Sequence, residues 1–292
     1  MATENFHISL KSFKLENVLF EGPFTENSIL STKTFKSLPS DIFLTTYPRT
    51  GTTWMQNILI GLIFEPETVA TTGAEEMGRM FPFMEHISSF FGNSGYERAE
   101  SMTTTPRLFK THLPIHLAPQ DIFTEKRKNI VVVRNPKDTA ISYNTFYMKK
   151  PVLKDFYRCE NLEQFLDKFL EGEILYGSWW KWTKEWITEA RSHPENILVL
   201  HYEDIALDFA EAVNKMCLFL NLPILSDVKL DELRILTSID DMKARYEPTG
   251  SYLINAGGSG GWEAHFSEGY RQKFDKLTRE NFGHFPFVDK FL

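Results

Sequence analysis

Residues 42–54 decide the fold, and they read IFLTTYPRTGTTW. Ile42–Thr46 is a short apolar run that predicts a strand, and residues 47–51 have the composition of a turn. The apolar residues that follow fall mostly on one face of a helix; they are Trp54, Ile58, Leu59, Leu62 and Ile63. The order therefore predicts a strand, a tight turn and a helix in immediate succession.

The rest of the chain continues this alternation of strands and helices. Further strands are predicted at 107–111, 130–133 and 196–201. Further helices are predicted at 136–148, 162–171, 179–191, 203–220, 230–236 and 267–280. The Gly-rich segment 246–261 predicts a long loop. Such alternation predicts an α/β fold with a central parallel sheet flanked by helices. Because no linker-like break is visible, we expect residues 1–292 to form a single domain.

The composition of the chain excludes several broad classes of protein. Of its 292 residues, 42% are hydrophobic and 24% are charged, which excludes a disordered or fibrous chain. The net charge of −7 argues against a nucleic-acid partner, and the longest apolar stretch, near 58–64, is too short to span a membrane. Cys159 and Cys217 are too few for a disulfide framework or a zinc site. Because the N-terminal residues lack an apolar leader pattern, we expect a cytoplasmic protein.

The junction between the first strand and its helix has the chemistry of an anion site. Successive backbone N–H groups beside a helix N-terminus bind anions. Gly51 would let the backbone approach the anion closely, and Arg49 adds a positive charge. Thr52 and Thr53 add hydroxyl donors. A plain strand-to-helix turn uses the same residue types, so the motif alone leaves both interpretations open.

The junction differs from the phosphate loop of nucleotide hydrolases. That loop requires Gly-Lys-Ser/Thr after a four-residue gap, and both the Lys and the gap are missing here. In those enzymes a neighbouring strand ends in an Asp that holds magnesium, whereas strand 130–133 is followed by Arg134. A basic residue at this edge of the sheet favours a second anion and no metal ion.

Several short motifs, taken together, point to one family of enzymes. They are Tyr47–Trp54; Lys110-Thr111-His112-Leu113-Pro114; Arg134-Asn135-Pro136-Lys137-Asp138 with Ser142-Tyr143; Tyr202-Glu203-Asp204; Thr237-Ser238 with Met242; and Gly260-Gly261-Trp262 with Phe266. With these motifs in this order, the chain resembles the cytosolic sulfotransferases of animals over nearly its whole length. The resemblance implies a P-loop-like sulfotransferase architecture. It also implies transfer of a sulfuryl group from 3′-phosphoadenosine-5′-phosphosulfate (PAPS) to a hydroxyl or amine of a small molecule.

The resemblance implies a chemical role for each of three residues and notes a substitution at a fourth. His112 corresponds to the general base that takes the acceptor's proton, and an ordinary histidine pKa of ~6.5 suits that role. Lys110 corresponds to a cation near the transferring sulfonate. Arg49 stands where the family has a Lys that contacts the bridging oxygen, so the charge is kept and its geometry changes. Thr50 stands where Ser is usual.

The resemblance also implies a donor-binding region and an acceptor-binding region. The donor would be held by Arg49, Thr50, Gly51, Thr52, Thr53 and Trp54; by Arg134 and Ser142 at its 3′-phosphate; and by Tyr202, Thr237, Ile239, Met242, Asn255, Ala256 and Gly257. The acceptor would be enclosed by Phe20, Phe24, Phe81, Phe83 and Phe146. Core packing is an equal explanation for each of these phenylalanines.

The C-terminal part of the chain departs from the family pattern. Where the family carries Arg-Lys-Gly, residues 255–257 read Asn-Ala-Gly, so two cations that hold the 3′-phosphate are absent. Their loss would weaken donor binding very roughly 10²- to 10⁴-fold, unless Lys243, Arg245 or Arg271 replaces them. The alternative is a sulfotransferase-fold protein that has lost donor use and acts as a ligand-binding protein or catalyses other chemistry.

The family's dimer-forming pattern is also altered. The corresponding positions are Glu263, Ser267, Glu268 and Gln272, which reverse one charge and place a carboxylate where the family has an apolar anchor. Charged residues are depleted from the centres of protein interfaces. We therefore expect a monomer, or a dimer through another surface.

Overall fold

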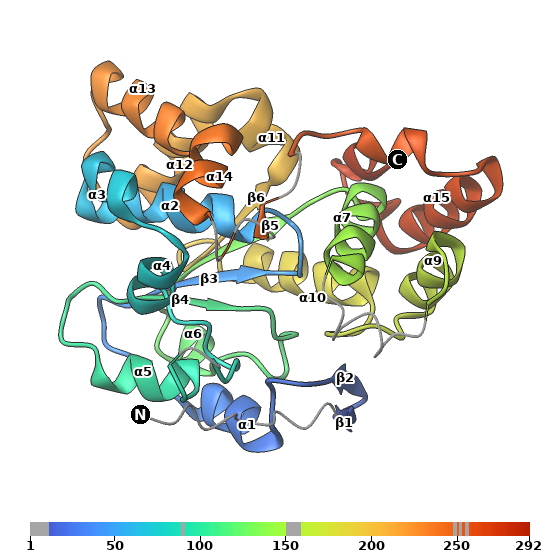
Figure 1. Ribbon diagram of the computed structural model, residues 1–292, viewed down its shortest axis with the longest axis horizontal. Coiled ribbons are helices and arrows are strands. Elements are labelled where there is room, and N and C mark those ends of the chain that lie inside the picture. Colours follow the sequence, from blue (N-terminus) through green and yellow to red (C-terminus); the bar gives the residue numbers. More distant parts are fainter. Residues whose placement is uncertain (1–11, 89–90, 150–158, 248–249, 251–252, 255–256) are drawn as a thin grey trace.

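A four-stranded parallel sheet lies at the centre of the protein (Figure 1). The computed structural model describes residues 12–88, 91–149, 159–247, 250, 253–254 and 257–292. The strands are β3 (Ile42–Thr46), β4 (Leu108–Thr111), β5 (Lys128–Val133) and β6 (Ile197–His201), in the order β4-β3-β5-β6. Their parallel register brings all four carboxyl ends to one edge of the sheet. The predicted α/β fold with a central parallel sheet is confirmed.

The two faces of the sheet contribute to different hydrophobic cores. Phe43 and Val131 pack into one core, whereas Leu44 and Ile130 pack into the other. This alternation follows from the pleat of a strand, in which successive side chains point to opposite faces. Because both faces are buried, the strands are continuous apolar runs rather than alternating ones.

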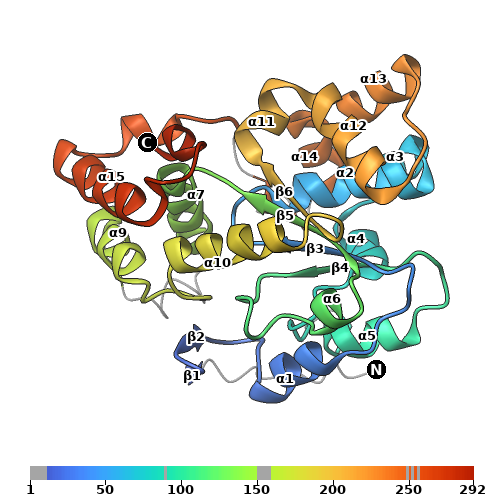
Figure 2. The ribbon, with the colours of Figure 1, turned by 180° about the vertical axis from the view of Figure 1, so that it is seen from behind.

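Helices cover both faces of the sheet (Figures 1 and 2). They are α1 (Glu26–Thr34), α2 (Thr52–Phe64), α3 (Pro66–Thr71), α4 (Ala74–Met80), α5 (Gly95–Ser101), α6 (Asp121–Thr124), α7 (Pro136–Met148), α9 (Leu162–Glu171), α10 (Trp179–Ser192), α11 (Tyr202–Leu207), α12 (Phe209–Leu220), α13 (Asp227–Leu236), α14 (Ile239–Tyr246) and α15 (Glu268–Phe282), with short 3-10 turns η2 (Gly261–Ala264) and η3 (Val288–Phe291). Helices α2, α12 and α13 share the core of Leu44, and α7, α9, α10 and α15 share that of Phe43. Within the described ranges, none of the helices has the length and apolarity needed to cross a membrane.

Helix α10 carries four tryptophans, and all four are buried: Trp179, Trp180, Trp182 and Trp186. The indole N–H of Trp182 donates to the backbone oxygen of His112 at 3.0 Å. The indole N–H of Trp186 donates to the backbone oxygen of Leu113 at 3.3 Å. A buried indole that satisfies its N–H in this way fixes the segment it contacts. Helix α10 therefore anchors the chain immediately after β4.

The structure differs from the predicted elements in several places. The single helix predicted for 203–220 is two helices, α11 and α12, which meet at Asp208. The Asp208 side chain accepts a hydrogen bond from the backbone N–H of Glu211 and so caps the second helix. Helix α14, helices α1 and α3–α6, and the hairpin of β1 (Phe13–Leu15) and β2 (Val18–Phe20) were not predicted, because these segments lack a clear apolar period. The predicted loop 246–261 lies partly outside the described residues.

Candidate active site

All four strands of the parallel sheet end at one cavity of about 1740 Å³. The loop after β3 contributes Arg49 and Gly51 to its lining. The residues that directly follow β4, β5 and β6 also line it, and they are His112, Arg134 and Tyr202. Open parallel sheets commonly bind ligands in the crevice beyond the carboxyl ends of their strands. The fold therefore brings residues of several sequence motifs to one place.

The loop after β3 is held in a shape that exposes its backbone to the cavity. Arg49 and Gly51 both have positive φ angles, of 72° and 102°. A side chain at Gly51 would be strained, because an added Cβ would lie 2.7 Å from Cδ2 of Tyr202. Helix α2 begins at Thr52, and its first turn lines the cavity. The first N–H groups of a helix have no partner within the helix, so this turn can bind an anion.

The threonines of this loop contribute in different ways. Thr52 and Thr53 line the cavity. Thr50 is fully buried and does not line it. Its hydroxyl instead lies 2.8 Å from the carbonyl oxygen of Tyr47 and 3.1 Å from that of Val132. Thr50 therefore fixes the loop against β5, and its side chain does not reach the donor-binding position that the sequence predicted for it.

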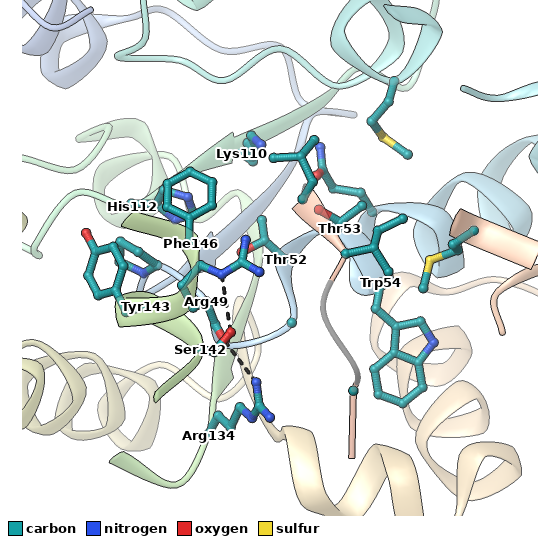
Figure 3. Close-up of a pocket in the computed structure, with 18 of the residues that line it drawn as sticks. Arg49, Thr52, Thr53, Trp54, Lys110, His112, Arg134, Ser142, Tyr143 and Phe146 are labelled. Carbon is teal, nitrogen blue, oxygen red and sulfur yellow. Dashed lines mark hydrogen bonds between the residues drawn. The ribbon is translucent and has the colours of Figure 1, made fainter. Parts of the chain in front are cut away.

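Two arginines, Arg49 and Arg134, line the cavity, and Figure 3 shows Ser142 between them. The Arg134 guanidinium donates to the backbone oxygens of Arg49 (3.2 Å) and Gly258 (2.9 Å). Its carbon lies 4.3 Å from the centre of the Tyr202 ring. Arg49 Nε donates to the Ser142 hydroxyl at 3.3 Å. Burial, followed by repulsion from Arg134, lowers the pKa of Arg49 to about 10, so Arg49 remains charged at neutral pH and attracts anions.

The His112 ring has a defined tautomer. Its Nδ1 lies 2.7 Å from the backbone oxygen of Thr46. A carbonyl oxygen can only accept, so Nδ1 carries the proton and Nε2 keeps the lone pair. The backbone N–H of His112 donates to Oε1 of Glu85 at 2.7 Å. The ring meets Phe83 and Tyr176 edge to face, with centroids 4.8 and 5.4 Å apart. These contacts hold a proton-accepting nitrogen in a cavity wall.

Lys110 provides a further cation near His112 (Figure 3). Its Nζ lies 4.7 Å from the centre of the Phe83 ring. Burial lowers the pKa of Lys110 to about 8, although the nearby Glu85 opposes that shift. Burial and the charge of Lys110 lower the pKa of His112 to about 3. His112 is therefore neutral at physiological pH, which is the form a general base requires, but its pKa lies well below the ordinary value of ~6.5 that the sequence led us to expect, so the free ring is a weaker base than predicted.

Four of the five phenylalanines predicted to enclose an acceptor line the cavity: Phe24, Phe81, Phe83 and Phe146. Arg49 lies over the Phe146 ring, with 4.9 Å between its guanidinium carbon and the ring centre. Phe20 differs from the sequence prediction, because it does not line the cavity. It is fully buried at the end of β2, where its ring packs against Tyr176 with centroids 5.6 Å apart. Phe20 therefore supports the wall from behind.

The opposite end of the cavity has a second group of aromatic rings. Trp54 meets Tyr202 edge to face at 5.2 Å and stacks on Phe209 at 6.4 Å. The other predicted donor-binding residues described here also line this cavity: Thr237, Ile239, Met242 and Gly257. The hydroxyl of Thr237 donates to the backbone oxygen of Leu233. Asn255 and Ala256 lie outside the described residues.

Comparison with known proteins identifies the family. Residues 39–286 match the family model described as the sulfotransferase domain. The chain belongs to the sulfotransferase family. It is 30% identical to cytosolic sulfotransferase 1 of Danio rerio, over 92% of this chain and 91% of that protein. It is 32% identical to sulfotransferase 1A1 of Rattus norvegicus, over 82% of this chain and 84% of that protein. The resemblance found in the sequence is thus confirmed.

Solved structures of other proteins share the fold of this chain. Mouse sulfotransferase SULT7A1, complexed with PAP, has a TM-score of 0.78 and 23% identity over 95% of this chain and 96% of that chain. Retinol dehydratase, in complex with androsterone and the inactive cofactor PAP, has a TM-score of 0.77 and 18% identity over 93% of this chain and 90% of that chain.

Within the part of the chain that the structure describes, no cluster of three or more His, Cys, Asp or Glu could hold a metal ion.

Three cations could replace the family's Arg-Lys pair, which is absent at residues 255–256 of this sulfotransferase, and the structure locates each of them. The Arg245 guanidinium makes its hydrogen bonds within the protein: it donates to the side chains of Asp241 and Asn57 and to three backbone oxygens. Arg271 lies over the ring of Trp262, 4.8 Å from its centre. Neither these two nor the exposed Lys243 lines the cavity. Arg49 donates to the Ser142 hydroxyl, and Figure 3 shows Arg134 on the other side of Ser142.

Sequence reasoning missed several residues that the structure places in the cavity wall. Tyr176 lines it beside His112, and Phe209 lines it beside Trp54. Glu21 is buried, and it too lines the cavity. An acidic residue between the apolar Phe20 and a Gly-Pro turn was the only sequence signal, and it is a weak one. Glu85 lies behind His112 and was not singled out either.

Proposed function

We propose that this sulfotransferase transfers a sulfuryl group from PAPS to a hydroxyl or amine of a small molecule, with His112 as the general base. One observation carries the proposal: the accepting nitrogen of His112 and the cations Arg49 and Lys110 belong to one cavity. Sulfuryl transfer needs positioning and positive charge more than covalent help from the protein, as phosphoryl transfer does. This cavity supplies both.

The proposed reaction is a single displacement at sulfur. His112 Nε2 takes the proton of the acceptor hydroxyl as the new O–S bond forms. The bond between sulfur and the 5′-phosphate oxygen of PAPS breaks, and 3′-phosphoadenosine 5′-phosphate (PAP) leaves. The negative charge that builds on the leaving oxygen would be stabilised by the N–H groups of residues 51–54, by Arg49 and by Lys110.

The donor would lie across the middle of the cavity. Arg134 and Ser142 would hold the 3′-phosphate, and the aromatic end formed by Trp54 and Phe209 would hold the adenine. The contact between Arg49 Nε and the Ser142 hydroxyl supports this proposal, because it would put the charge of Arg49 beside both anionic groups of a donor bound in this way. Arg49 would thus contribute to both phosphate sites.

The test is calorimetric titration of the full chain with PAP and, in parallel, with AMP, which lacks the 3′-phosphate. We expect PAP to bind at least tenfold tighter, since a charge-assisted contact contributes about 1.5–3 kcal/mol. A transfer assay with PAPS and a panel of phenols and alcohols should follow. Equal binding of PAP and AMP, together with no transfer, would favour the alternative of a ligand-binding protein or other chemistry.

We also propose that the chain acts as a single-domain cytoplasmic monomer. Glu268 begins α15, is exposed, and accepts a hydrogen bond from Gln272 at 2.9 Å, which supports a solvated role for this face. Light scattering after size exclusion should give the mass of one chain, 33.9 kDa. A stable dimer that the substitution Glu268→Val leaves unchanged would point to another surface.

A further inference from the structure

The cavity contains one acidic side chain that the proposed reaction does not use. Glu21 follows β2, lines the cavity and is only 1% exposed. Both of its carboxyl oxygens are buried, and neither has a hydrogen-bond partner among the described residues. Burying a polar group without a partner costs free energy, and native proteins seldom leave one unsatisfied. A carboxyl group kept in this state in a cavity wall indicates that a ligand supplies the partner.

The neighbours of Glu21 place it at the same end of the cavity as His112. Two residues before it, the backbone oxygen of Leu19 accepts a hydrogen bond from the N–H of Tyr176 at 3.2 Å. The Tyr176 ring in turn meets the His112 ring at 5.4 Å. Three residues after it, the Phe24 ring meets the Tyr176 ring at 5.7 Å. Glu21 is therefore associated with the acceptor end and not with the arginines that would hold the donor.

The chemistry of this position favours a neutral partner. Burial raises the pKa of the Glu21 carboxyl to about 8, and no cation among the described residues opposes that shift. The group is therefore mostly protonated at neutral pH. A protonated carboxyl both donates and accepts a hydrogen bond, which matches a hydroxyl group. An ammonium group would fit less well, because its charge would lose its hydration among apolar walls.

We propose that Glu21 is a specificity-determining residue that binds a second hydroxyl group of the acceptor, remote from the hydroxyl that receives the sulfuryl group. The acceptor class is then a molecule with an apolar body and a hydroxyl group at each end. Phe24 and Phe83 would enclose the apolar body. The inference rests on the proposed function, since His112 fixes the position of the reacting hydroxyl.

The test compares two matched series of ligands by calorimetric titration of the full chain in the presence of PAP. The 4-alkylphenols and the 4-(ω-hydroxyalkyl)phenols of equal length differ by the terminal hydroxyl group. Because PAP carries no sulfuryl group, binding is measured without turnover. We expect the hydroxylated ligand to bind about tenfold tighter at one chain length, as one satisfied buried hydrogen bond would give. That length reports the span between His112 and Glu21.

Variants of Glu21 separate hydrogen bonding from charge and from bulk. Glu21→Met removes the hydrogen-bonding group, so the affinity ratio between the two series should fall to about 1. Glu21→Gln keeps a donor and an acceptor and should retain most of the preference. Glu26→Gln is the matched control, because it removes an exposed acidic charge on α1 and should leave the ratio at the wild-type value. Thermal unfolding of each variant confirms that it folds.

Several results would overturn the inference. The first is equal binding of the alkylphenols and the hydroxyalkylphenols at every chain length. The second and third concern the variants: the preference for the hydroxylated ligand survives Glu21→Met, or it is lost in Glu21→Gln. The fourth is tighter binding of the corresponding aminoalkylphenols than of the hydroxyalkylphenols. Failure of the proposed function would look different. If PAP does not bind, the same titrations on the chain without nucleotide still measure the ratio that Glu21 controls.

Discussion

The two ends of the cavity are built from different interactions. At the end proposed to hold the donor, Arg134 donates to two backbone oxygens and the hydroxyl of Thr50 is held by backbone carbonyl groups. At the end proposed to hold the acceptor, the Phe24 ring meets Phe83 and Tyr176 edge to face, with centroids 6.0 and 5.7 Å apart. A hydrogen bond to the backbone has a narrow geometry, whereas aromatic contacts tolerate rotation. The fold thus determines the donor end closely, and replaceable side chains determine the acceptor end.

His112 contacts Phe83 and Tyr176 at the proposed acceptor end, and its removal should have the largest effect. We expect His112→Ala to lower kcat about 10²- to 10⁴-fold, because the general base is lost. The Kd for PAP should stay within about twofold, since the donor contacts lie elsewhere. Transfer assays and calorimetry measure the two quantities, with His116→Ala as the matched control outside the cavity. An equal loss of PAP affinity would contradict this assignment and place His112 in the donor end.

Arg134 should give the next largest effect, confined to the donor end. Arg134→Met should weaken PAP binding about 10- to 100-fold and AMP binding much less, because AMP lacks the 3′-phosphate. Calorimetry with both nucleotides measures the difference. Arg271→Met is the control, since Arg271 packs on Trp262 and does not line the cavity. Equal losses for PAP and AMP would contradict the assignment of Arg134 to the 3′-phosphate.

The pH dependence of kcat/KM should report the loss of charge on Lys110. In the free protein the pKa of Lys110 is about 8, so its charge is lost as the pH rises past that value. We expect kcat/KM to fall above pH 8 by up to about tenfold per pH unit. Lys110→Arg should move the fall to higher pH, because a guanidinium stays charged. A profile unchanged in this variant would assign the fall to another group.

The smallest expected effect is that of a Glu21 substitution on the thermal stability of the fold. Its folded pKa of about 8 lies above the ordinary 4.5, so the folded chain holds a proton that the unfolded chain releases. The stability from this group is fully present below pH 4.5 and is lost as the pH rises through 8. Glu21→Gln should therefore raise Tm by about 2–6 °C at pH 8 and by less at pH 5. Scanning calorimetry at both values checks this, and a change independent of pH would contradict it.

Much of the fold could be predicted because its signals are local. The apolar runs of β3 and β5, and Pro136 at the first turn of α7, indicate their elements without help from the rest of the chain. The first residues after the strands could be placed together for the same reason, since the carboxyl ends of parallel strands meet at one edge. The residues themselves pointed to anion sites at Arg49 and Arg134, whereas His112 was assigned to the same site through the resemblance to the sulfotransferases.

The residues that could not be predicted depend on distant partners. Phe20 and Phe24 are alike in sequence, yet pairing of the β2 strand with the chain near Leu175 buries the first and leaves the second in the cavity wall. The sequence predicts that Thr50 binds the PAPS donor, whereas in the structure its hydroxyl lies within hydrogen-bond distance of the Val132 carbonyl oxygen. The isolation of the Glu21 carboxyl is likewise a property of the packed structure.

The distribution of tryptophans gives the protein a built-in optical probe. Five of its six indoles are buried, four on α10 and one at Trp262, whereas Trp54 is partly exposed in the cavity wall. Red-edge excitation and acrylamide quenching should therefore select the emission of Trp54. A nucleotide seated against that ring would alter its fluorescence while the buried indoles stay constant. Donor occupancy can then be followed in stopped-flow experiments without a label.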